Sequence, residues 1–148
     1  FPNAVLVAMG PERLAAGEHV YTMCVDGRLA AFTWLVPNQR TAKLPSVEQQ
    51  IEFPPNSCTS YGSYALPSFR GRGIYKKVLS TALCDAFDSL GALAVYAAVD
   101  ENNDASTHMK QVYGYVPARR LVLRRRFGST QRENIDLLTA APRPEAGG

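Results

Sequence analysis

Residues 65–91 read ALPSFRGRGIYKKVLSTALCDAFDSLG, a glycine-rich loop that opens directly into a helical pattern. The apolar side chains recur at helical spacing and form one stripe, made of Ile74, Val78, Ala82, Leu83, Ala86 and Leu90. Most of the charged side chains lie off this stripe, and Gly91 supplies a C-terminal stop. The stretch therefore predicts an amphipathic helix that packs on a sheet.

The position of the loop Phe69–Ile74, between a predicted strand and this helix, indicates an anion-binding site. A helix N-terminus presents unpaired N–H groups and the positive end of the helix dipole, and both favour a bound anion. Gly71 and Gly73 allow the backbone to approach a phosphate closely, and Arg70 and Arg72 can add charge-assisted hydrogen bonds. Glycine-rich turns between a strand and a helix also occur for structural reasons alone, so the loop by itself leaves both interpretations open.

Two apolar-rich runs earlier in the chain predict a β-hairpin. His19–Val25 and Arg28–Val36 are separated by Asp26-Gly27, a dipeptide that suits the positive φ angles of a two-residue turn. Pro37 ends the second strand. Before the hairpin, Pro11–Gly17 predicts a short helix or an irregular turn.

Further elements are predicted on both sides of the loop. Val47–Phe53 is a candidate strand in a proline-rich stretch, and Ser57–Leu66 predicts the strand that leads into the loop. Leu93–Val99 is a continuous apolar run, which predicts a strand buried on both faces inside the sheet. Several N-capping side chains then precede a short helix from about Ala105 to Tyr113, and Arg119–Phe127 predicts a late strand.

This order of elements predicts a mixed α/β fold with helices on the faces of a twisted sheet. The chain has 148 residues, 46% of them hydrophobic and 20% charged, so we expect one compact domain over residues 1–139. Ala140–Gly148 has two prolines and no large apolar side chain, which predicts a disordered tail. Because the chain starts at Phe1 rather than at a methionine, we expect further residues upstream of it.

Composition excludes several classes of function. No apolar run approaches the roughly 18 to 20 residues of a membrane-spanning helix, and no secretory signal begins the chain, so we expect a soluble, cytoplasmic protein. Three widely spaced cysteines and two distant histidines predict reduced thiols and no metal site. The absence of GxSxG argues against a hydrolase triad. A net charge of +3 attracts anions without implying nucleic acid.

Taken together, these segments resemble the GNAT superfamily of N-acetyltransferases. The acetyl-CoA motif of that family has the form Q/R-x-x-G-x-G/A, and Arg70–Tyr75 reads RGRGIY here. The strand-ending Ala65–Pro67 looks like the hydrophobic-x-Pro sequence that precedes the motif in that family. Downstream, Asn103 and Ser106 match its Asn-x-x-Ala/Ser, and Gly114-Tyr115 matches its Gly-aromatic pair. The combination in order, rather than any one motif, makes the resemblance specific.

The resemblance, which spans roughly residues 19–127, implies a GNAT-like, mostly antiparallel sheet with helices on both faces, and acetyl-CoA or CoA as the cofactor. It also implies direct attack of a neutral amine on the thioester. Backbone N–H groups in the loop would hold the pyrophosphate, strand backbone would line the pantetheine, and an N–H near Leu66 would stabilise the oxyanion. The implied cofactor-binding residues are Ala65, Leu66, Arg70, Gly71, Arg72, Gly73, Ile74, Tyr75, Asn103 and Ser106.

Two positions depart from the family pattern. Tyr75 stands where the motif usually has Gly or Ala, and Lys110 stands where many members have a tyrosine thought to protonate the leaving thiolate. Tyr113, one helical turn past Lys110, is the candidate replacement acid, and Glu52 and Tyr64 are the candidate proton acceptors. The structural alternative makes Tyr64 and Tyr113 packing residues and Glu52 an exposed strand carboxylate.

Three functions remain open at this stage. The first is an acyl-CoA-dependent N-acetyltransferase that acts on a small amine or amino sugar. The second is a GNAT-like module that binds CoA with weak or no catalysis, which Lys110 and Tyr75 favour. The third is a basic module for nucleic acid, but no nucleic-acid-binding motif accompanies the arginine run at 124–126, and a charged strand edge explains that run. Strand edges can also pair between subunits, which leaves a homodimer open.

Overall fold

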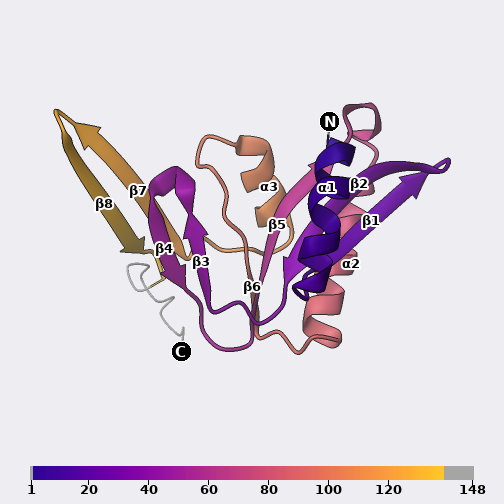
Figure 1. Ribbon diagram of the computed structural model, residues 1–148, viewed down its shortest axis with the longest axis horizontal. Helices are drawn as coiled ribbons and strands as arrows, with labels where there is room; N and C mark the ends of the chain where they lie inside the picture. The colour runs from indigo at the N-terminus through magenta and orange to yellow at the C-terminus, as the bar shows by residue number, and fades with distance from the viewer. Residues whose placement is uncertain (1, 139–148) are drawn as a thin grey trace, which may run out of the picture. The chain divides into compact units, whose positions relative to one another are not determined.

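The computed structural model describes residues 2–138, with backbone alone for residues 2–8 (Figure 1). The chain divides into two compact units, which are considered one at a time. The first comprises Phe1–Arg40 and Phe53–Ala98, and the second comprises Thr41–Glu52 and Val99–Gly148. The single domain over 1–139 therefore stays a prediction, and the tail at 140–148 lies outside the described residues.

A four-stranded sheet forms the centre of the first unit. Its strands are β1 (His19–Val25), β2 (Arg28–Val36), β5 (Ser57–Ala65) and β6 (Ala94–Tyr96), in the order β1-β2-β5-β6. The β1–β2 and β2–β5 pairs are antiparallel, whereas β5 and β6 run parallel. This arrangement confirms the mixed, mostly antiparallel sheet.

The β1–β2 hairpin forms with the predicted boundaries. Its turn residues Asp26 and Gly27 have φ angles of +50° and +72°, which is the left-handed region that this two-residue turn requires. Val25 pairs with Arg28 across the turn, and His19 pairs with Leu35 at the far end. The turn dipeptide thus sets the register next to the turn, and an irregularity between Met23 and Cys24 shifts it by one residue over the rest of the hairpin.

Two helices cover opposite faces of this sheet. The helix α1 (Pro2–Ala15) places the Arg13 guanidinium 3.9 Å from the ring centroid of Trp34, whereas α2 (Ile74–Asp88) packs its Ala86 in one buried cluster with Leu35. Because adjacent strand residues point to opposite faces, α1 and α2 lie on different sides of β2. Helices on both faces of the sheet are therefore confirmed.

Two elements of the first unit differ from the sequence prediction. The β5–β6 ladder pairs only Ser57–Thr59 with Ala94–Tyr96, so β6 is a short edge strand, and Leu93 and Val99 on either side of it are 78% and 37% exposed. The prediction of an inner strand over Leu93–Val99 was wrong, because an apolar run reports burial only when neighbours cover it. The first helix is also longer than predicted and contains Pro11.

The second unit contains two hairpins and one helix. Its strands are β3 (Thr41–Leu44) with β4 (Gln49–Glu52) and β7 (Arg119–Arg126) with β8 (Ser129–Asp136), and the helix is α3 (Asp104–Val112). Short 3₁₀ turns cover Pro45–Val47 here and Pro67–Phe69 in the first unit. The sequence analysis predicted neither β3 nor β8. The strand β8 reads STQRENID and lacks the apolar alternation by which a strand is predicted.

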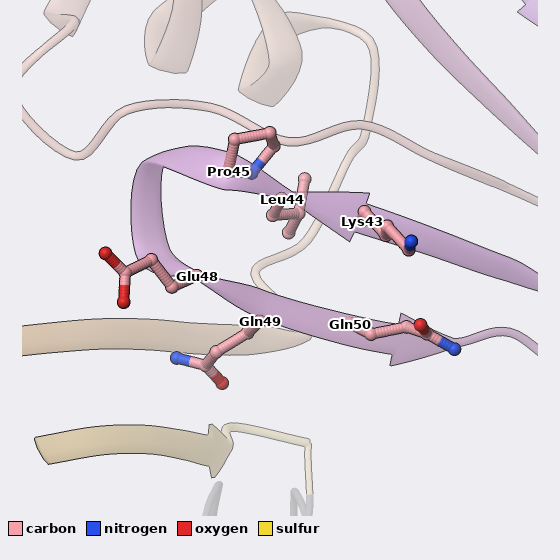
Figure 2. A pocket seen from close by; sticks show the side chains of 6 residues that line it. All are labelled: Lys43, Leu44, Pro45, Glu48, Gln49 and Gln50. Atoms are coloured by element: carbon pink, nitrogen blue, oxygen red, sulfur yellow. The ribbon is translucent and has the colours of Figure 1, made fainter.

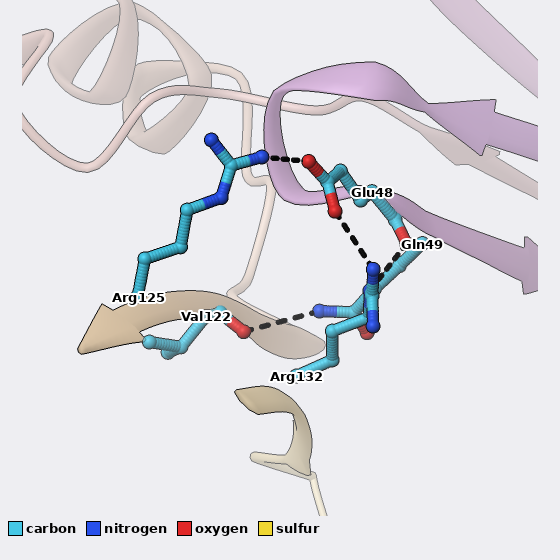
Figure 3. A network of polar contacts seen from close by, with 5 residues as sticks. All are labelled: Glu48, Gln49, Val122, Arg125 and Arg132. Carbon is cyan, nitrogen blue, oxygen red and sulfur yellow. Dashed lines mark hydrogen bonds and ion pairs between the residues drawn. The ribbon is translucent and has the colours of Figure 1, made fainter. Parts of the chain in front are cut away.

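A polar network connects β7 and β8 to the β3–β4 hairpin within the second unit (Figure 3). The Gln49 side-chain amide donates to the carbonyls of Val122 and Glu133, at 3.3 and 3.1 Å, which pair with each other in the β7–β8 register. The Glu48 carboxylate accepts from Arg125 and, at 2.7 Å, from Arg132. Arg125, a member of the arginine run, is thus paired with a carboxylate of the same unit.

Candidate functional site

The RGRG loop adopts a conformation that only glycine takes without strain. Gly71 and Gly73 have φ angles of +76° and +71°, and Gly73 is the residue immediately before α2. No side chain caps this end of the helix, and a Cβ at either glycine would meet no atom within 4 Å. The glycines therefore serve the backbone conformation, and they leave open space beside an uncapped helix N-terminus.

The end of β5 shows which backbone groups face the loop side. The Leu66 N–H donates to the Ala30 carbonyl at 2.9 Å, so it is already used in the sheet. Ala65 precedes Leu66 and pairs with Ala31. Because hydrogen-bonded and non-hydrogen-bonded pairs alternate along an antiparallel ladder, the Ala65 N–H and carbonyl face away from β2. Arg70 Nε donates to that carbonyl at 3.0 Å. The Leu66 amide is therefore unsuited to hold an oxyanion, and the Ala65 N–H replaces it as the candidate.

Cationic side chains surround the loop. The Arg70 guanidinium lies 5.7 Å from the Tyr64 ring centroid, and the Arg72 guanidinium lies 5.7 Å from that of Phe69. Arg28, at the start of β2, places its guanidinium 5.8 Å from the same Phe69 ring. Sequence reasoning missed Arg28, and the only signal available was its place directly after the hairpin turn.

The remaining loop residues have mixed roles. The Ile74 side chain is 8% exposed and belongs to the buried cluster with Phe69 and Val78, so only its backbone can face a ligand. Tyr75 is half-buried. The Tyr64 ring stacks on Phe32 with centroids 6.1 Å apart, which supports the packing interpretation without removing its half-buried hydroxyl from consideration.

Asn103 and Ser106 form a helix cap in the second unit. The Asn103 side-chain oxygen accepts a hydrogen bond from the Ser106 N–H at 3.1 Å and caps α3. This spacing is the ordinary geometry of a side-chain N-cap, and it explains both residues without a ligand. Their assignment to cofactor binding stays a prediction.

Lys110 is the buried cation of α3. Its side chain is 9% exposed, and its Nζ lies 5.2 Å from the Tyr115 ring centroid. Burial lowers the pKa of Lys110 because the charged form loses solvation. Tyr113 is the half-buried C-cap of the same helix, and Glu52 is an exposed residue at the end of β4.

The structure brings part of the predicted site together in the first unit. The end of β5 and the RGRG loop are continuous, and Tyr64 lies beside Arg70. The other candidates, which are Glu52, Asn103, Ser106 and Tyr113, belong to the second unit. Sequence therefore predicts the cofactor loop as one local structure, whereas the candidate catalytic residues come from separate parts of the chain.

A cavity of about 300 Å³ lies on the β3–β4 hairpin, and none of the predicted site residues lines it (Figure 2). It is lined by Lys43, Leu44, Pro45, Glu48, Gln49 and Gln50. Figure 2 shows these side chains spread along the hairpin. Two of them, Glu48 and Gln49, are already engaged by the β7–β8 hairpin, so a structural role accounts for them.

The cysteines form no disulfide within the described part of the chain. Cys58 is buried, whereas Cys24 and Cys84 are exposed, and all three are free thiols. Among residues 2–138, no three His, Cys, Asp or Glu side chains gather as metal ligands. No helix in that range has the length and apolar character needed to cross a membrane.

The chain matches known acetyltransferases in sequence pattern and in fold. The model of the acetyltransferase (GNAT) family matches residues 5–115. The aminoglycoside N-acetyltransferase AAC(6')-Iy, solved with the bisubstrate analogue CoA-S-monomethyl-acetylneamine, superposes with a TM-score of 0.63 at 22% identity, covering 85% of this chain and 81% of that one. An N-acetyltransferase from Staphylococcus aureus Mu50 gives a TM-score of 0.61 at 18% identity, with coverages of 88% and 74%.

A putative acetyltransferase from Agrobacterium tumefaciens strain C58 gives a TM-score of 0.56 at 21% identity, over 74% of this chain and 69% of that one. No curated protein matches the sequence. At these identities the solved structures establish the fold alone, whereas the family model covers most of the chain. The chain therefore belongs to the GNAT family of acetyltransferases.

Proposed function

We propose that this protein transfers an acetyl group from acetyl-CoA to the nitrogen of a small amine or amino sugar. The observation that carries the proposal is the RGRG loop, in which two positive-φ glycines precede an uncapped helix N-terminus in a chain of this family. Such a loop suits a pyrophosphate, because adjacent N–H groups and the helix dipole favour an anion there.

The residues of the loop fit CoA. Gly71 and Gly73 leave space for a phosphate where side chains would otherwise project, and Arg70 and Arg72 supply positive charge beside it. The Ala65 N–H, which faces away from β2, is placed to continue strand-like hydrogen bonding to the pantetheine or to hold the oxyanion. Acetyl-CoA, when bound, would supply the thioester that activates the acetyl group, and CoA would leave as the thiol.

Acetyl transfer involves three catalytic roles. A base must take the proton from the ammonium form of the acceptor, an N–H must stabilise the oxyanion, and an acid protonates the leaving thiolate unless solvent does so. We assign the N–H to Ala65, keep Glu52 and Tyr64 as candidate bases, and keep Tyr113 as the candidate acid. A thiol with a pKa near 8.5 leaves tolerably without an acid, so Tyr113 is the most dispensable of the four.

The acceptor class is supported by the fold neighbours. AAC(6')-Iy is named as an aminoglycoside N-acetyltransferase, and its structure contains an analogue that joins CoA to acetylneamine. Amino sugars and other small amines are therefore the first acceptors to test for this chain.

A CoA-binding module with weak catalysis is the second candidate. Lys110, a buried cation, stands where the family resemblance places a tyrosine acid. The experiment is release of free CoA thiol from acetyl-CoA over a panel of aminoglycosides, polyamines and amino acids, with CoA binding measured on the same samples. Acceptor-dependent release supports the transferase; CoA binding without release for any acceptor supports the module; no CoA binding contradicts both.

A further inference from the structure

Arg28 and Arg72 come from different elements, and each places its guanidinium over the same aromatic ring. Arg28 opens β2 after the hairpin turn, and Arg72 lies in the RGRG loop. Their guanidinium carbons lie 5.8 and 5.7 Å from the ring centroid of Phe69. Phe69 is 8% exposed and packs with Ala30, Ala31, Ile74 and Val78, so the ring is fixed by the core and both cations are held beside it.

Among the described residues these two arginines have no carboxylate partner, in contrast to five others. Arg13, Arg120, Arg124, Arg125 and Arg132 each form an ion pair with a glutamate. Within residues 2–138, neither Arg28 nor Arg72 forms one, and both side chains are exposed. Both guanidinium groups are positively charged, so an anion bound close to both of them would be stabilised by both charges.

The sheet register shows where Arg28 lies relative to the loop. Leu66 N–H bonds to the Ala30 carbonyl, and Ala31 pairs with Ala65, so the antiparallel β2 begins beyond the C-terminal end of β5. Arg28 is therefore beside the segment that connects β5 to α2. It therefore adds a positive charge to the loop region, although it belongs to β2 and not to the loop.

CoA carries one more phosphate than the loop backbone would engage. The pyrophosphate is assigned to the loop amides, whereas the phosphate on the ribose 3′ position keeps a charge of about −1.5 to −2 at neutral pH, as phosphate monoesters do. Guanidinium groups match phosphate oxygens in geometry and charge. We propose that Arg28, together with Arg72, binds the 3′-phosphate of CoA and makes the protein select CoA over 3′-dephospho-CoA. This inference rests on the proposed CoA site.

The test is isothermal titration of CoA and of 3′-dephospho-CoA into the wild-type protein, Arg28→Gln, Arg72→Gln and Arg40→Gln. Arg40 is an exposed arginine of the same unit, so its substitution is the matched charge control. The wild type should bind CoA about tenfold or more tightly than dephospho-CoA, since charge-assisted hydrogen bonds contribute roughly that factor. Arg28→Gln should lose that preference by weakening CoA alone, and Arg40→Gln should keep it.

The outcomes separate this inference from the proposed function. Equal wild-type affinities for the two ligands, or an Arg28→Gln variant that keeps the preference or weakens both ligands equally, would overturn the role of Arg28 and leave the CoA site standing. Binding of neither ligand by folded wild type would overturn the proposed function. Because Arg28 is exposed, its variant should fold, and Arg28→Lys, which keeps the charge but loses the planar fork, should retain part of the preference.

Discussion

Gly73 is the residue whose backbone most directly links the loop to its proposed ligand. Its φ of +71° lies in the left-handed region, and the helix begins at the next residue. An aspartate there tolerates this region better than most residues and suits a helix N-terminus, but it brings negative charge to the place proposed for a phosphate. Gly73→Asp should therefore keep the fold and weaken CoA binding more than tenfold, as measured by titration.

The control for Gly73→Asp is Gly73→Ala. An alanine Cβ would meet nothing within 4 Å, so its cost is the strain of a positive φ, about 1 to 2 kcal/mol. Alanine should thus reduce stability more than aspartate does and CoA affinity less. Unchanged CoA affinity in folded Gly73→Asp would place the pyrophosphate elsewhere.

Tyr113 and Lys110 are the two candidates for protonating the leaving thiolate in the proposed reaction. If the Tyr113 hydroxyl donates the proton, Tyr113→Phe should lower turnover about 10²-fold and leave CoA affinity nearly intact, because only the hydroxyl is removed. Lys110→Met keeps the length of a buried side chain and removes its charge. Turnover of both variants with one acceptor is the measurement: a loss confined to Lys110→Met would transfer the role to Lys110, and no loss in either would leave solvent as the acid.

At the scale of elements, local chemistry explains which parts of the fold the sequence could predict. Asp26-Gly27 determines a turn by itself, and the stripe of α2 determines a helix, so both elements form with nearly the predicted boundaries. The strand β8 has no apolar alternation and is specified by its pairing with β7. The length of β6 depends on how far β5 and β6 run together, which no local pattern encodes.

The packing of α2 on the sheet can be tested at Leu79. This side chain is 0% exposed, so Leu79→Ala removes buried apolar surface and leaves a cavity. The free energy of unfolding should fall by about 2 to 5 kcal/mol, as measured by urea denaturation. Leu93→Ala is the control, because Leu93 is 78% exposed and its loss should change stability little. Equal effects of the two substitutions would contradict the burial of α2 on the sheet.

The contact between β1 and α2 should make stability depend on pH. The Tyr21 hydroxyl donates to the Asp85 carboxylate, and this bond, with smaller contributions from Ser89 and His19, lowers the pKa of Asp85. A carboxyl group whose pKa is lower in the folded state stabilises the fold above its unfolded pKa, near 3.9, and loses that contribution as the pH falls through the folded value. Tyr21→Phe should therefore destabilise the protein at pH 6 and less so below pH 3, as measured by thermal melting at each pH. A difference that stays constant with pH would contradict the contact.

For the whole molecule, the RGRG loop is the part of the candidate site whose backbone conformation the sequence predicts well, because that conformation depends on consecutive residues. Arg28 could not be predicted as part of it, since the β2–β5 register alone brings that residue beside the loop. The sequence also could not show that the Leu66 amide is already hydrogen-bonded, because its partner Ala30 lies on another strand. Asn103 and Ser106 show the opposite case, in which a family motif coincides with a helix cap that the fold needs anyway.

The central claim is that the RGRG loop binds CoA, and thermal denaturation with and without CoA tests it most directly. A ligand that binds only the folded state stabilises it, by about 2.7 kcal/mol when its concentration is 100 times the dissociation constant. We expect the melting temperature of the wild-type protein to rise with CoA concentration and that of Gly73→Asp to stay nearly constant over the same range. A correctly folded wild-type protein whose melting temperature does not change at millimolar CoA would contradict the account.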